Sequence, residues 1–173
     1  MNEHEKELWE NIRSYQIGAA QSALSFSDRL ARENNWSLKY ALRVIFEYKK
    51  FIFLICVDKG PFTPSDEVDQ AWHLHLLYTE DYWEDFCGEL LQTKIHHGPT
   101  KGGQSERVKY TDLYEQTLKR YESFFGEKPP SDIWPSTEIR FSKVNFIRVL
   151  KEDYFFIPKK LKTILSSWKN LKK

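Results

Sequence analysis

The chain has 173 residues, of which 16% are aromatic, so it is long enough to bury one sizeable core and too rich in large apolar side chains to be disordered. Its seven Gly and seven Pro are too few and too clustered for a sandwich of many short strands, and no apolar run reaches the roughly 20 residues that cross a bilayer. The formal net charge is +1, but residues 140–173 carry ten Lys/Arg against two Asp/Glu. We therefore expect a single mainly α-helical domain, residues 1–157, followed by a basic segment, residues 158–173.

The N-terminal part predicts amphipathic helices that surround a central one. Apolar residues recur at helical spacing over residues 5–33, which indicates one long helix or two shorter ones. Ser37 can cap a second helix over residues 38–57, whose second half is apolar nearly all round and is expected in the centre of the core. The N-terminus is charged and lacks the apolar stretch of a signal peptide, so a cytoplasmic location is expected, with Cys56 and Cys87 as free thiols.

The middle of the chain predicts two further helices and a loop. Thr63-Pro64-Ser65-Asp66-Glu67 has the form of a helix start, with a capping hydroxyl, Pro at a first-turn position and acidic residues over the positive end of the helix dipole, and the helix is expected to run to Tyr78. A short helix over residues 82–91 and a loop over residues 93–103 follow.

The last part of the chain predicts a mixture of helix and irregular structure. A helix over residues 105–125 is ended by Gly126, and an irregular Pro-containing segment follows at residues 132–135. Residues 138–157 are rich in Phe, Ile and Val and allow one or two short strands, whereas residues 159–173 predict a basic amphipathic helix. The expected fold is thus a single-domain helical bundle with irregular segments.

Four of the five histidines fall in two pairs, His73/His75 and His96/His97. Helix residues two apart point about 200° away from each other, whereas residues four apart share a face. Asp69 and His73 can therefore belong to one site, but His75 cannot bind the same ion as His73. With one histidine from the loop, Asp69, His73 and His97 form a set of two histidines and one carboxylate, which is typical of open Zn or Fe sites.

Two chemistries are open to this set. Asp69 and His73 either both bind a divalent metal, or Asp69 fixes the imidazole tautomer so that His73 acts as a ligand or a base. A third reading is purely structural, because buried histidines commonly only satisfy hydrogen bonds in a core. Further candidate ligands, in decreasing order of interest, are His75 and His96, then Cys87, Asp81 and Asp85.

A longer pattern surrounds these residues: Val68-Asp69-Gln-Ala-Trp72-His73-Leu-His75-Leu-Leu77, followed by Tyr82, Cys87 and His97. It resembles the glycine-rich domain-containing protein-like family of plants, fungi and bacteria, over about residues 60–135. The resemblance implies no particular reaction, since the family is one of unknown biochemical function, and the glycine-rich tail of its plant members is missing here. The positions to which it draws attention are Asp69, Trp72, His73, His75 and His97.

Two other segments bear on binding. The loop that follows His97 could hold an anion with Lys101, or cover the histidine site as a lid. Residues 159–173 carry Lys on one side and Trp, Leu and Ile on the other, which suits docking on their own domain, a protein partner or an anionic membrane surface. No recognised module accompanies the basic charge, so nucleic-acid binding is disfavoured.

Two hypotheses about function follow. The first is a metal-binding or metal-dependent hydrolytic or acid–base domain centred on Asp69, His73 and His97, with Trp72 beside them. The second is a non-enzymatic interaction module that uses residues 159–173. The sequence leaves open whether the protein is an enzyme.

Overall fold

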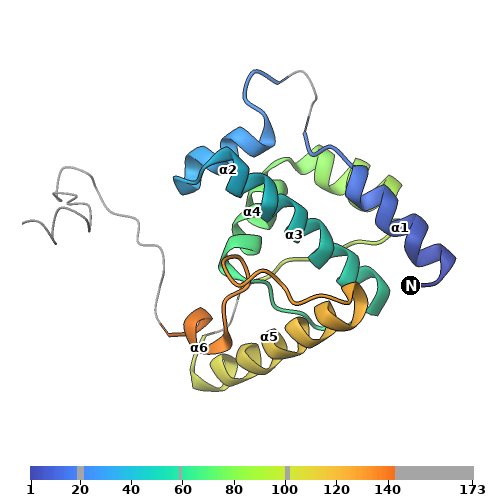
Figure 1. Cartoon of the computed structure of the whole chain (residues 1–173). Coiled ribbons are helices and arrows are strands. Elements are labelled where there is room, and N and C mark those ends of the chain that lie inside the picture. The colour runs from blue at the N-terminus through green and yellow to red at the C-terminus, as the bar shows by residue number, and fades with distance from the viewer. Residues whose placement is uncertain (19–21, 59, 100–101, 143–173) are drawn as a thin grey trace, which may run out of the picture. The chain divides into compact units, whose positions relative to one another are not determined.

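A computed structural model describes residues 1–18, 22–58, 60–99 and 102–142 (Figure 1). The regular structure in these residues is entirely helical, which confirms the mainly α fold. In chain order the helices are α1 (Glu3–Ser14), α2 (Phe26–Asn34), α3 (Leu38–Asp58), α4 (Asp66–Leu77), the π-helix η1 (Asp81–Leu90), α5 (Gln104–Phe125) and α6 (Thr137–Arg140).

The C-terminal predictions are only partly within the described residues. The first residues for which strands were allowed form the helical turn α6, and Met1–Ser142 make up one compact unit. The rest of that range, the helix expected at residues 159–173 and the domain boundary at residue 157 all lie outside the described residues and stay predictions.

The N-terminal amphipathic stretch is two helices and not one. Helix α1 ends at Ser14 and the chain continues in an extended conformation at Tyr15. Helix α2 begins after Ser25, whose side chain accepts a hydrogen bond from the backbone N–H of Asp28. The serine therefore supplies a local start signal that the apolar periodicity of the stretch does not reveal.

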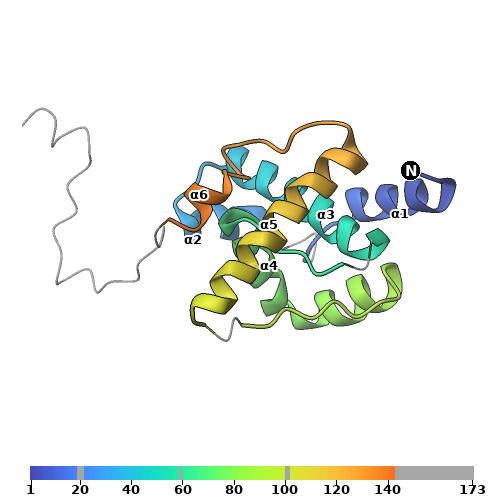
Figure 2. The same cartoon turned by 90° about the horizontal axis from the view of Figure 1, so that it is seen from below.

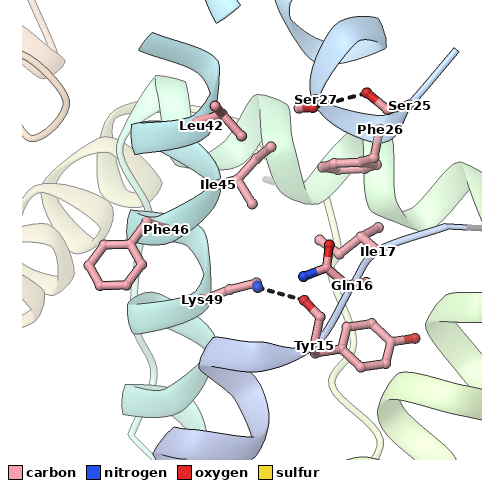
Figure 3. Close-up of a pocket in the computed structure, with 10 residues that line it drawn as sticks. All are labelled: Tyr15, Gln16, Ile17, Ser25, Phe26, Ser27, Leu42, Ile45, Phe46 and Lys49. Carbon is pink, nitrogen blue, oxygen red and sulfur yellow. Dashed lines mark hydrogen bonds between the residues drawn. The ribbon is translucent and has the colours of Figure 1, made fainter. Parts of the chain in front are cut away.

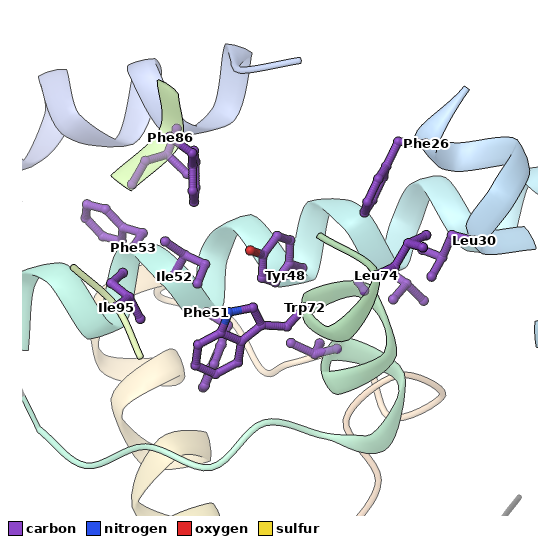
Figure 4. Close-up of a cluster of buried hydrophobic side chains, with 14 of the residues drawn as sticks. Phe26, Leu30, Tyr48, Phe51, Ile52, Phe53, Trp72, Leu74, Phe86 and Ile95 are labelled. Atoms are coloured by element: carbon purple, nitrogen blue, oxygen red, sulfur yellow. The ribbon is translucent and has the colours of Figure 1, made fainter. Parts of the chain in front are cut away.

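Helix α3 is the centre of the fold and contacts α1, α2, α4 and α5. Apart from Lys49 and Lys50, its second half is apolar nearly all round, and Tyr48, Phe51, Ile52 and Phe53 are fully buried. Figure 4 shows these side chains leaving α3 in several directions, with Phe51 beside Trp72 of α4. The all-round hydrophobicity predicted from the sequence thus corresponds to a helix covered by others on all sides.

Buried polar side chains join α3 to α5 and to the irregular segment that follows α5. Lys50 Nζ donates to the Tyr121 hydroxyl at 2.5 Å and to Glu127 Oε1 at 2.8 Å. Glu47 Oε2 accepts a hydrogen bond from the Trp134 indole N–H at 2.9 Å. These contacts fix the irregular Pro-containing segment on the core.

None of the described helices combines the length and hydrophobicity needed to cross a bilayer.

Candidate metal centre

The candidate centre is built on α4, whose start is fixed by its own sequence. The Ser65 side chain accepts a hydrogen bond from the backbone N–H of Val68 at 3.2 Å, and acidic residues occupy the first turn. Val68, Ala71, Trp72 and His75 are buried. Their spacing of three and four residues turns one face of the helix into the core and leaves Asp69 and His73 along its edge.

Asp69, His73 and His97 meet at this edge. His73 Nδ1 lies 3.7 Å from Asp69 Oδ2, and His97 Nε2 lies 3.2 Å from Asp69 Oδ1. The Nε2 atoms of the two histidines are 2.7 Å apart. One candidate ligand atom from each residue lies within 4.8 Å of the others, so the three side chains are close enough to hold one metal ion.

His97 reaches α4 because the segment that carries it is fixed at two points. Figure 2 shows the chain after η1 running back alongside that helix. Ile95 is buried, and its backbone carbonyl accepts a hydrogen bond from the Tyr82 hydroxyl at 2.7 Å. The Tyr82 oxygen in turn accepts from the Trp72 indole N–H at 2.9 Å. Trp72 then stacks on the His97 ring, with centroids 4.3 Å apart and planes inclined by 26°.

Tyr82 is the positioning residue that the sequence analysis did not single out. It was noted only as part of the family pattern, although a tyrosine at a set distance after the Trp-His motif was the available signal. Its hydroxyl lies between α4 and the His97 segment and contacts both. Trp72, by contrast, was singled out, and the structure places it directly beside the candidate centre.

His75 lies away from the candidate centre, in a buried network. Its Nδ1 is 2.8 Å from the Tyr48 hydroxyl and its Nε2 is 2.7 Å from Asp81 Oδ1. Burial lowers the pKa of His75, although its hydrogen bond to Asp81 opposes that shift. Burial alone would raise the pKa of Asp81, but hydrogen bonds from His75 and the Gly18 N–H bring it below its usual value. A neutral His75 therefore donates from Nε2 and accepts at Nδ1, which leaves neither nitrogen for a metal.

The other predicted site residues are not brought to the centre. His96 is exposed and its ring lies 5.4 Å from that of Trp83. Cys87 is buried, and burial raises the pKa of its thiol, which disfavours the reactive thiolate. Asp85 is exposed on η1. Lys101 lies outside the described residues.

A cleft of about 400 Å³ opens beside the centre. Asp69 and His97 form part of its wall, together with Thr63 and Tyr110. Thr63 is only 6% exposed, and its hydroxyl has no hydrogen-bond partner among the described residues. A buried hydroxyl without a partner costs free energy.

These features define a mainly helical domain with an Asp/His/His group at the edge of a cleft. The chain is similar to glycine-rich domain-containing protein 1 of Arabidopsis thaliana, with 23% identity over 117 residues, which cover 65% of this chain. The aligned region is 14% of that much longer protein. No family model matches the sequence, and no solved structure gives a significant match.

Proposed function

We propose that the protein binds one divalent transition metal ion, Zn²⁺ in the first place and Fe²⁺ as the alternative, through Asp69, His73 and His97. The observation that carries the proposal is the convergence of three ligand atoms of the right chemical type within 4.8 Å. Two imidazoles and one carboxylate are a donor set that zinc and non-haem iron sites share.

The Nε2 atoms of His73 and His97 lie at hydrogen-bond distance, and a small displacement of the two rings would let both bind one metal ion. In a tetrahedral site with bonds of about 2.0–2.1 Å, two nitrogen ligands lie about 3.3 Å apart. The Nε2 atoms of His73 and His97 are 2.7 Å apart, so the rings need to separate by well under about 1 Å. His97 lies on a loop segment, which can make that adjustment more readily than two residues on one helix.

The site leaves room for a reaction. Among the described residues three side chains converge as candidate ligands, and a cleft opens beside them. A divalent ion held by three protein groups supplies Lewis acidity and activates water, which is the chemistry of metal-dependent hydrolysis. Within the chain, Asp69 would hold the two imidazoles in place and the cleft would orient a substrate. We therefore propose a hydrolytic or acid–base reaction as the activity.

Metal binding is tested with protein purified without a His tag. We expect calorimetry to give one Zn²⁺ per chain, and His73→Gln and His97→Gln each to weaken binding by at least about tenfold. His96→Gln is the matched control, since it removes the neighbouring histidine of the same segment and should leave binding unchanged. Equal affinity in the wild type and His97→Gln would overturn the proposed ligand set.

The activity is tested separately, on the zinc-loaded protein. We expect hydrolysis of model aryl esters or phosphodiesters that His73→Gln abolishes and His96→Gln retains. Stoichiometric zinc binding without hydrolysis of either class would refute the activity and keep the metal site.

We also infer that this chain shares a domain with the glycine-rich domain-containing proteins. The Asp-x-x-Trp-His-x-His pattern at residues 69–75 supports this inference, together with the partial similarity to the Arabidopsis protein. A crystal structure of the corresponding segment of that protein tests it: the same helical arrangement is expected, and an unrelated fold would exclude a shared domain.

A further inference from the structure

A second pocket lies beside α3, on the face of that helix that points away from α4 and the candidate metal centre. It has a volume of about 250 Å³ and is bounded by α2, α3 and the chain that follows α1. Figure 3 shows apolar side chains along two of its walls, with Phe26 from α2 and Ile45 from α3. Leu42 and Phe46 lie at its edge and remain largely exposed to solvent.

Lys49 is the charged residue in this pocket. The residue is only 8% exposed, and its ammonium donates to the backbone carbonyls of Arg13 at 2.8 Å and Tyr15 at 2.6 Å. An ammonium has three donors, so one donor remains after these two bonds. No carboxylate of the described residues forms an ion pair with it. Burial lowers the pKa of Lys49 to about 8, and no neighbouring anion offsets that effect.

A buried cation without a counter-ion is costly, and an anion that enters the pocket would relieve that cost. The other polar side chains that line the pocket are uncharged: the Tyr15 phenol, the Gln16 amide and the hydroxyls of Ser25 and Ser27, which lie 3.0 Å from each other. The Ser25 hydroxyl also donates to the carboxylate of Asp28, which does not line the pocket. One cation among neutral groups matches a single negative charge. A phosphate dianion would leave about one charge uncompensated in a partly apolar site, so it fits less well.

We propose that this pocket binds a monocarboxylate with an aliphatic chain, whose carboxylate pairs with Lys49 and whose chain lies along Ile45, Leu42 and Phe46. The site is independent of the proposed metal centre, because none of its lining residues belongs to that group. The ligand would cover apolar side chains that water otherwise contacts, which supplies the favourable free energy of burial.

Three probes of equal chain length separate charge from hydrophobicity: octanoate, octanol and octylamine. We expect calorimetry or chemical-shift titration of the full chain to show saturable binding of octanoate. Octanol should bind at least about tenfold more weakly, because it lacks the charge that pairs with Lys49, and octylamine should not bind measurably.

Variants assign the effect to Lys49. Lys49→Met keeps most of the aliphatic stem and removes the charge, so octanoate binding should weaken to the level of octanol. Lys39→Met is the matched control, because Lys39 is an exposed lysine of the same helix, and binding should not change. If Lys49→Met does not fold, Leu42→Asp serves instead, because it adds a negative charge at the exposed edge of the pocket. It should weaken the binding of octanoate more than that of octanol. Leu42→Asn is its uncharged control.

Two results would overturn the proposal. One is octanoate and octanol binding to the wild type with equal affinity. The other is an octanoate affinity that neither Lys49→Met nor Leu42→Asp changes.

Discussion

Two identical side chains, two residues apart on α4, have opposite surroundings. His73 is about half exposed and meets Asp69 and His97, whereas His75 is completely buried between Tyr48 and Asp81. The difference follows from the helix period alone, since residues two apart lie on nearly opposite faces. The buried histidine holds α4 to α3 and η1, and the exposed one is available to a ligand.

This contrast predicts different costs of substitution. His75→Phe leaves the Tyr48 hydroxyl and Asp81 without their partner, so we expect a loss of about 2–4 kcal/mol in the free energy of unfolding. His73→Phe in metal-free protein should change it by less than about 1 kcal/mol, because the side chain is half exposed. Urea unfolding measures both. Equal costs for the two substitutions would contradict the assignment.

Lys49 predicts a pH dependence of stability. Its pKa in the folded protein is about 8, below the ordinary value of about 10.4 for the unfolded chain. Between these values the unfolded chain binds more protons, so the free energy of unfolding should rise with pH. The neighbouring groups do not titrate in this window in the folded protein, because burial lowers the pKa of His75 and raises that of Tyr15.

The measurement compares the wild type with Lys49→Met in urea at pH 7.5 and pH 10. We expect the wild type to gain about 1–2 kcal/mol relative to the variant, less than the full pKa shift implies because the two carbonyl acceptors favour the charged form. A constant difference between the two proteins across this range would mean that Lys49 keeps an ordinary pKa.

At the scale of elements, the helices were predictable where the sequence contains capping residues and apolar residues at helical spacing. They were less predictable where the path of the chain depends on tertiary contacts. Gly126 marks a helix end at the residue where the structure has it, whereas α4 is capped by Ser65 and so begins after Pro64, which was expected in its first turn. The pairing of Asp69 with His73 also follows from spacing. The approach of His97 does not, because it depends on Ile95 and on the hydroxyl of Tyr82.

The winding of η1 was not predictable either. An ordinary short helix was expected over residues 82–91, and the chain forms a π-helix, with the Leu91 N–H donating to the carbonyl of Phe86, five residues earlier. The wider turn puts Tyr82, Phe86, Cys87 and Leu91 on the buried side, at spacings of four, one and four residues. Such windings are frequent near functional sites, and here it carries both Asp81 and Tyr82.

The cap of α4 gives a prediction at this scale. Ser65 is fully buried and satisfies the backbone N–H of Val68, so Ser65→Ala should lower the free energy of unfolding by about 1–2 kcal/mol. Ser25→Ala removes the corresponding cap of the partly exposed α2 and should cost about 0.5–1 kcal/mol. Thermal or urea unfolding ranks the two. A larger loss for Ser25→Ala would show that the α4 cap is not a main support of that helix.

Two kinds of polar contact join α3 to the segment that follows α5. Glu47 is buried and accepts from Trp134, with Lys50 Nζ 3.4 Å away, so it joins α3 to the segment after α5. Arg43 forms a bidentate pair with Asp132 of that same segment, but both side chains are exposed. Solvent screens the exposed pair, so that pair contributes little. Water does not replace the buried carboxylate when it is removed, so its partners are left unsatisfied.

We therefore expect Glu47→Leu to lower the free energy of unfolding by about 3 kcal/mol, because it leaves the Trp134 N–H and part of the Lys50 charge unsatisfied. Arg43→Met should leave the urea midpoint nearly unchanged. Each variant removes one α3 side chain that contacts the segment after α5. The difference between their free energies of unfolding therefore measures the effect of burial. A destabilisation by Arg43→Met as large as that by Glu47→Leu would contradict this explanation.

The separation of His73 and His97 along the chain has one more consequence. They are 24 residues apart, and the chain between them includes η1 and the exposed Lys94. An ion bound by both would act as a removable cross-link, closing this stretch as a disulfide closes a loop. Trypsin needs the chain around Lys94 to open before it can cut. We expect zinc to slow that cut and a chelator to restore it, so the metal would govern the protein's resistance to proteolysis.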